Sequence, residues 1–131
     1  MVEVVEAKIE EFESAEACFT SETFGNVCLK VSPLKAKVLK VGDGYSIELI
    51  VDHTVVAERR NFNLYLCNPQ IINKPVHIRQ NKPGWVRLSI EGKSVKVSVE
   101  IMRILVSEAG SDPAGNPCVA VYWVHGVVPQ C

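Results

Sequence analysis

The sequence predicts an all-β domain, built as a small antiparallel β-barrel or β-sandwich with eight or nine strands. Three observations lead to this fold class. Apolar and polar side chains alternate with a period of two over several segments, and glycine-containing turns separate those segments. Valine, which suits a pleated and half-buried surface, is used heavily. No alternation of strands with helical patterns is present, so a parallel α/β sheet is not expected.

The alternation is clearest in residues 45–51, 85–90 and 95–101, where every second side chain is apolar, and it predicts strands over 45–51, 85–90 and 95–105. Shorter stretches of the same kind cover residues 27–31 and 62–66. These segments are typical of an antiparallel sheet that has one buried face and one solvent-exposed face. The side chains expected in the core are those of Leu49, Leu64, Val97, Val99, Val121 and Trp123.

Two further segments are apolar without a clear alternation. Residues 118–128 are almost continuously apolar, which predicts a strand over 118–125 that lies centrally and is buried on both faces. Residues 2–19 fit either a helical stripe or a strand. We favour a strand at the start of the chain, followed by a short acidic turn or by at most one short helix.

Turn residues lie between the predicted strands. Residues 42–44 and 91–93 contain glycine and predict tight hairpins. Ser32-Pro33 is expected to break or bend the chain, because proline cannot donate a hydrogen bond within a central ladder. Residues 107–117 carry Gly, Pro, Ala and Ser without periodicity, and they predict a mobile surface loop.

Composition indicates one globular domain over residues 1–131, with 47% hydrophobic and 22% charged residues. No run reaches 18 apolar residues, so we expect no membrane-spanning helix and no membrane partner. The beginning of the chain is acidic and lacks a continuous apolar stretch, unlike a signal peptide. A cytoplasmic or intracellular protein is therefore expected, with a virion as an alternative location.

The five cysteines are Cys18, Cys28, Cys67, Cys118 and Cys131. None belongs to a CxxC pair, so neither a zinc ribbon nor a thioredoxin-like motif is present, and no metal site is expected. Buried free thiols are the favoured interpretation. A disulfide between the first two is an alternative, since intracellular disulfides occur in hyperthermophiles. The terminal cysteine is the natural candidate for an unpaired or intermolecular thiol.

Charge is unevenly distributed along the chain. Residues 1–26 form an acidic N-terminal arm or strand with net charge −6, and residues 27–131 carry net charge +5. Basic side chains with interspersed rings could form a platform for single-stranded nucleic acid, in which cations follow the backbone and rings stack on bases. The candidate residues are Lys35, Lys37, Lys40, Tyr45, Arg79, Lys82, Trp85 and Arg87. The alternative is that the lysines protect an exposed strand face and that the two rings belong to the core.

No pattern of catalytic residues is present. Asp52 and His53 are adjacent, but neighbours on a strand point to opposite faces, so the carboxylate does not orient the imidazole. His77 and His125 lie singly within predicted strands. GxSxG, P-loop and HExxH motifs are absent. We expect a non-enzymatic protein without catalytic residues, cofactor or small-molecule substrate.

Two stretches resemble a known family. One begins at Ser21-Glu22-Thr23-Phe24 and continues, after two strands, to residues 41–49 (VGDGYSIEL); the other is residues 120–128 (AVYWVHGVV). Residues 62–66 match an intervening strand, so the likeness covers about a third of the chain. These segments are similar to the small OB-like barrel subunit of archaeal and eukaryotic RNA polymerases, the eighth-subunit family. The resemblance implies an OB-like fold and a non-enzymatic assembly subunit with weak binding of single-stranded nucleic acid.

A second hypothesis rests on composition alone. High valine content, many cysteines, a continuous apolar strand and a short acidic arm are also expected of a self-assembling protein. Such a protein would form a shell or filament, as the structural proteins of viruses of thermophilic archaea do. Both hypotheses predict a protein partner, which is either a larger complex or further copies of this chain.

Overall fold

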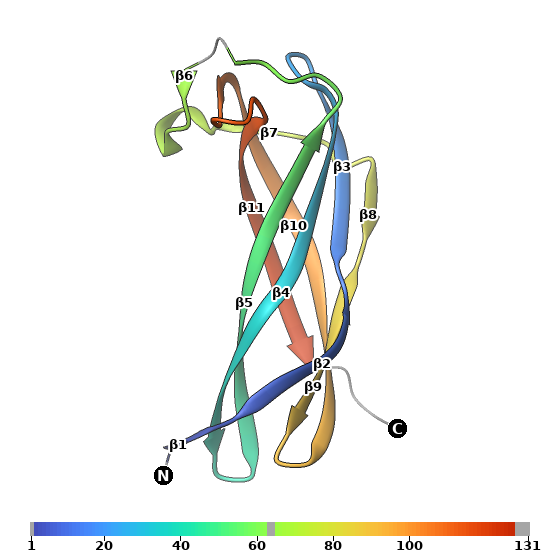
Figure 1. Cartoon of the computed structure of the whole chain (residues 1–131), viewed down its shortest axis with the longest axis vertical. Coiled ribbons are helices and arrows are strands. Elements are labelled where there is room, and N and C mark those ends of the chain that lie inside the picture. Colours follow the sequence, from blue (N-terminus) through green and yellow to red (C-terminus); the bar gives the residue numbers. More distant parts are fainter. Residues whose placement is uncertain (1, 63–64, 128–131) are drawn as a thin grey trace.

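The computed structural model describes residues 2–62 and 65–127, and it is all-β, as the sequence predicts. Two antiparallel sheets enclose one hydrophobic core in an elongated molecule (Figure 1). The strands are β1 (Val2–Val5), β2 (Ala7–Glu13), β3 (Ala15–Ser21), β4 (Gly25–Val41), β5 (Gly44–Ala57), β6 (Tyr65–Leu66), β7 (Lys74–Pro75), β8 (Gln80–Lys82), β9 (Gly84–Ile90), β10 (Lys93–Ser111) and β11 (Pro117–Val127). A 3₁₀ turn, η1, covers Pro69–Ile71.

One long strand organises each sheet. In the first sheet, β4 pairs along one edge with β5, and its other edge pairs with β3 and then with β1. β8 pairs with the outer edge of β3. In the second sheet, β10 pairs along one edge with β11, and its other edge pairs with β9, β7 and the parallel strand β6. β2 pairs with the outer edge of β9.

The chain crosses between the sheets on one side of the molecule. β1 belongs to the first sheet, β2 to the second and β3 to the first again, and the segment from β7 to β8 returns from the second sheet to the first. After β5 the chain again passes toward the second sheet, where the Asn61 N–H donates to the Gly115 carbonyl in the turn between β10 and β11. Along their lengths, β5 and β11 approach each other without pairing (Figure 1). The fold is therefore open along the edges of β5 and β11.

The core consists of alternate side chains from the inner faces of both sheets. Phe19 and Leu29 come from the first sheet, and Leu88 and Ile101 come from the second. All four side chains are fully buried. This arrangement explains the period-two pattern, because only one face of each sheet is removed from water.

Most of the predicted strands and core residues are confirmed. The strands predicted at 45–51, 85–90, 95–105 and 118–125 lie within β5, β9, β10 and β11. Leu49, Val97 and Val99 are buried, and Val121 and Trp123 are half-buried against the core. Leu64 lies outside the described residues.

The prediction of a central position for residues 118–125 is wrong. β11 pairs with β10 only, so it is an edge strand within the described residues. Its outward side chains Tyr122 and Val124 are exposed. A continuous apolar run is compatible with either position, because it carries no information about the number of neighbouring strands.

The segment predicted as a loop over 107–117 is also corrected. β10 continues to Ser111, and only residues 112–116 form a turn. Ser107 and Ser111 are buried, although both are polar. The backbone N–H groups of Ala114 and Asn116 both donate to the side chain of Asp112. Small residues allow close packing here, and they do not indicate a loop.

Three smaller predictions differ from the structure. The chain does not break at Ser32-Pro33, because β4 runs through it with a register shift between Pro33 and Lys35. Only Tyr65–Leu66 of the strand predicted at 62–66 is a strand within the described residues. No helix follows the first strand, since residues 15–21 form β3. With the short strands β6, β7 and β8, the described residues form eleven strands, and not the eight or nine that the sequence predicts.

Candidate functional site

The three lysines of β4 do not share one face. Lys35 and Lys37 are exposed on the outer face of the first sheet, whereas Lys40 has the opposite parity and points the other way. Lys40 Nζ donates to Glu91 Oε2 at 3.4 Å, and the Tyr45 hydroxyl donates to the same oxygen at 2.6 Å. This hydrogen bond raises the pKa of Tyr45 and holds the pKa of Glu91 below its usual value. Lys40 and Tyr45 thus join two hairpins.

Trp85 lies on the outer face of the second sheet, where its indole ring has two cations beside it. The Lys96 ammonium is 4.9 Å from the ring centroid, and the Arg87 guanidinium carbon is 5.6 Å from it. The indole Nε1 donates to Glu13 Oε2 at 3.3 Å. The alternative interpretation, in which Trp85 belongs to the core, is therefore wrong, and its ring lies on the surface.

Acidic residues of β2 pair with the cations of this cluster. Glu11 accepts a hydrogen bond from Arg87 at 2.8 Å, and Glu13 forms an ion pair with Lys82. The hydrogen bond from Lys82 lowers the pKa of Glu13, and the same bond raises the pKa of Lys82. The N-terminal acidic segment thus neutralises part of the basic surface instead of extending away as an arm.

The eight candidate residues therefore form no single nucleic-acid platform. Seven of them occupy three places: Lys35 and Lys37 on the first sheet, Lys40 and Tyr45 at the hairpins, and Lys82, Trp85 and Arg87 in the cluster around Trp85. Arg79 is engaged separately, since its guanidinium donates to Asn26 Oδ1 at 2.8 Å. Lys96 also belongs to the cluster around Trp85 and was not among the predicted residues, although it lies on the polar face of residues 95–101.

The edges of β5 and β11 are the second notable feature. Both strands are long, with 14 and 11 residues, and each pairs on one side only within the described chain. The outer residues Tyr122 and Val124 of β11 are 53% and 51% exposed, and Val127 is 57% exposed. Between Pro117 and Val127 the strand contains no Asp, Glu, Lys or Arg. A free edge offers unpaired N–H and C=O groups to another strand.

Four cysteines form two disulfides, which replaces the expectation of free thiols. Cys18 is bonded to Cys28, the alternative raised by the sequence, and Cys67 is bonded to Cys118. The second pair spans 51 residues, and no local pattern pointed to it. Cys131 lies outside the described residues. Disulfides persist in oxidising compartments and inside hyperthermophiles.

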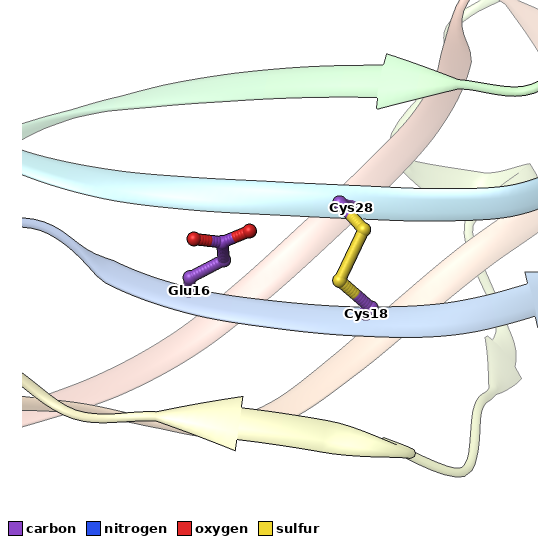
Figure 2. A group of neighbouring side chains, drawn as sticks. All are labelled: Glu16, Cys18 and Cys28. Carbon is purple, nitrogen blue, oxygen red and sulfur yellow. A yellow bond between two sulfur atoms is a disulfide. The ribbon is translucent and has the colours of Figure 1, made fainter.

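The first disulfide has a carboxylate beside it. Figure 2 shows Glu16 and Cys18 on β3 and Cys28 on β4, with the Glu16 carboxylate next to the sulfur atoms. One carboxylate oxygen and the two Sγ atoms all lie within 4.8 Å of one another. Cys18 is buried, whereas Cys28 and Glu16 are half-buried on the outer face of the sheet.

Glu108 connects the two sheets near the β3–β4 turn. Its carboxylate accepts hydrogen bonds from the Ser21 hydroxyl, from the Glu22 N–H at 2.8 Å and from Lys74 Nζ at 3.2 Å. Partial burial would raise the pKa of Glu108, but these three donors together hold it below its usual value. Because Ser21 is almost fully buried, this network fixes the β3–β4 turn against β10.

Comparisons with known proteins add no relative: no family model, no curated protein and no solved structure matches the chain. Within residues 2–62 and 65–127, no helix is long and apolar enough to cross a membrane.

Proposed function

We propose that this chain is a non-enzymatic assembly subunit, and that it binds a second copy of itself through the free edge of β11. The observation that carries the proposal is an 11-residue edge strand with exposed apolar side chains and no Asp, Glu, Lys or Arg. Soluble proteins usually protect such an edge with lysine, a bulge or a covering segment. β5 approaches this edge but does not pair with it, so the N–H and C=O groups of β11 remain suited to strand addition from another chain.

A second copy fits this edge electrostatically. Two β11 strands can pair in antiparallel fashion without placing carboxylates, ammonium groups or guanidinium groups of like charge opposite each other, because the strand contains no Asp, Glu, Lys or Arg between Pro117 and Val127. β5 is less suitable, since a pair of β5 strands centred on Ile50 would place Glu48 opposite Asp52. We therefore assign the interface to β11.

Light scattering coupled to size-exclusion chromatography tests the proposal. The mass should rise with concentration from 14.5 kDa toward twice that value. Val124→Lys should hold the protein at the monomer mass, because it places a cation on the edge strand in each copy. Met102→Lys is the matched control: Met102 is 60% exposed on β10, away from the free edge, and its replacement should leave association unchanged.

A larger complex is the alternative occupant of the same edge. The resemblance to the RNA polymerase subunit favours this alternative, in which β11 would receive a strand from another protein. A chain that stays monomeric at every concentration would contradict pairing with a second copy. It would leave a strand from another protein as the occupant of the β11 edge. A dimer that Val124→Lys and Met102→Lys leave equally intact would place the interface elsewhere.

Binding of single-stranded nucleic acid is a second candidate, supported by the ring of Trp85 with Lys96 and Arg87 beside it. Trp85→Ala should weaken binding of a labelled oligonucleotide by about 1–3 kcal/mol while leaving the salt dependence unchanged. Arg87→Ala should instead reduce the slope of log K against log salt by about 0.7. Absence of binding by the wild type at low salt would exclude this activity.

A further inference from the structure

Cys18 and Cys28 are held in position by the sheet as well as by their disulfide. They lie opposite each other in the β3–β4 ladder with a Cα–Cα distance of 4.1 Å. On the far side, Cys18 pairs with Gln80 of β8, and Cys28 pairs with Val56 of β5. Because both strands have neighbours on both sides, we expect reduction to leave two thiols facing each other on an intact sheet.

Glu16 adds a third donor to this pair. It lies two residues before Cys18, so both side chains project from the same face of β3 (Figure 2). Its carboxylate forms no hydrogen bond or ion pair with another residue in the described chain. The carboxylate is therefore available to a ligand.

We propose that reduction of the Cys18–Cys28 disulfide creates a binding site for a thiophilic divalent cation such as Zn²⁺, with the two thiolates and the Glu16 carboxylate as ligands. Zinc binds sulfur at about 2.3 Å and carboxylate oxygen at about 2.1 Å, so two thiolates on a tetrahedral ion lie about 3.8 Å apart. The three donor atoms already lie within 4.8 Å of one another, and side-chain rotation can bring them to these distances. Water would complete the coordination on the exposed side.

The chemistry balances in two steps. A dithiol reductant breaks the S–S bond, transfers two electrons and two protons to the sulfurs of Cys18 and Cys28, and becomes a disulfide itself. The cation then displaces both thiol protons to solvent, because the thiolate is the ligand. A disulfide oxidant reverses the sequence: it accepts two electrons and two protons to become a dithiol, the Cys18–Cys28 bond re-forms, and the ion is released. Metal binding is thus coupled to the redox state of the pair.

Neighbouring lysines suit the charge of such a site. Two thiolates, one carboxylate and a divalent ion leave a net charge of −1. Lys30 of β4 and Lys82 of β8 lie opposite Glu16 in the two flanking ladders. Their positive charges stabilise an anionic complex and favour the thiolate form of the cysteines.

Alkylation of individual cysteines tests the proposal. A Cys131→Ser protein is reduced, freed of reductant, and treated with iodoacetamide with and without Zn²⁺, and the modified peptides are quantified by mass spectrometry. Zn²⁺ should slow alkylation of Cys18 and Cys28 at least tenfold, but not that of Cys67 or Cys118. Glu16→Gln should raise the Zn²⁺ concentration needed for protection at least tenfold.

Glu48→Gln is the matched control, since Glu48 is exposed on the outer face of β5 and should have no effect. Equal alkylation of Cys18 and Cys28 with and without Zn²⁺ would overturn the proposal, as would protection that Glu16→Gln leaves unchanged. Circular dichroism covers the case in which the reduced protein unfolds. Recovery of the β-sheet signal on adding Zn²⁺, lost in Glu16→Gln, supports the site, and absence of recovery overturns it.

Discussion

The backbone of Gly84 lies very close to the segment in which the chain passes from the second sheet to the first. It begins β9 and lies directly against the chain where β2 passes into β3. A Cβ atom at this position would be 2.4 Å from both the Ala15 nitrogen and the Glu13 carbonyl oxygen, and 2.7 Å from the Ser14 carbonyl carbon. These are backbone atoms, so no side-chain rotation can relieve the overlap. Gly84→Ala therefore requires the strands to separate by about 1 Å, given contact distances of about 3.5 Å.

The cost of this separation can be estimated from overpacking in protein cores. Extra methyl groups in well-packed interiors destabilise by about 1–3 kcal/mol, and more where the backbone must move. We expect about 3 kcal/mol for Gly84→Ala, because the displaced segment carries ladder hydrogen bonds of both β2 and β3. That loss is a large part of a typical stability of 5–15 kcal/mol. It corresponds to a fall of roughly 10 °C in Tm.

Urea unfolding followed by tryptophan fluorescence measures the loss. Gly44→Ala is the control, because the nearest atom to its added Cβ, outside the adjacent residues, is the Val41 carbonyl oxygen at an ordinary 3.8 Å. The control should change the free energy of unfolding by no more than about 0.5 kcal/mol. If Gly84→Ala is as stable as Gly44→Ala, the close approach of β9 to the β2–β3 junction is refuted.

Three further predictions follow from burial and hydrogen bonding. Val99→Ala should cost on the order of 1–3 kcal/mol in urea unfolding, whereas Val4→Ala, at a position 75% exposed, should cost less than about 0.5 kcal/mol. Asp112→Ala removes two hydrogen bonds from the turn and should lower the free energy of unfolding by about 1–2 kcal/mol. An unchanged unfolding midpoint would show that these hydrogen bonds do not stabilise the protein. Because the pKa of Glu108 is lowered by folding, its contribution to stability is present above the usual value near 4.5 and is lost as pH falls through the folded pKa. The wild type should therefore lose more stability than Glu108→Gln between about pH 6 and about pH 3 in thermal unfolding, and parallel losses would contradict this role.

Local patterns in the sequence predicted much of the fold. Alternation in residues 95–101 reports directly that one face is buried, and Gly42 and Gly92 adopt the positive φ values that the hairpins require. Position within a sheet is not a local property. Residues 118–125 are equally apolar whether one neighbouring strand or two are present, so their place at an edge could not be predicted. Residues 107–111 resemble a loop in composition, yet small side chains here serve close packing in β10.

The candidate site was predicted in part. Successive side chains of a strand point to opposite faces, so Lys35 and Lys37 share one face of β4 and Lys40 lies on the other. This separation could have been predicted from the residue numbers alone. The ion pairs between β2 and the cluster around Trp85 join residues more than 60 positions apart, and they depend on the return of the chain to β8 and β9 beside the β2–β3 segment. The Cys67–Cys118 disulfide depends on tertiary structure in the same way.

Amide hydrogen exchange at increasing protein concentration tests the central claim most directly. In the monomer, the N–H groups of β11 that point away from β10 have no strand partner in the described chain and should exchange rapidly. Pairing of two β11 edges would protect them as concentration rises, while β5 would keep the same exchange rates. Rates in Pro117–Val127 that do not change with concentration, or protection that develops along β5 instead, would contradict assembly through β11.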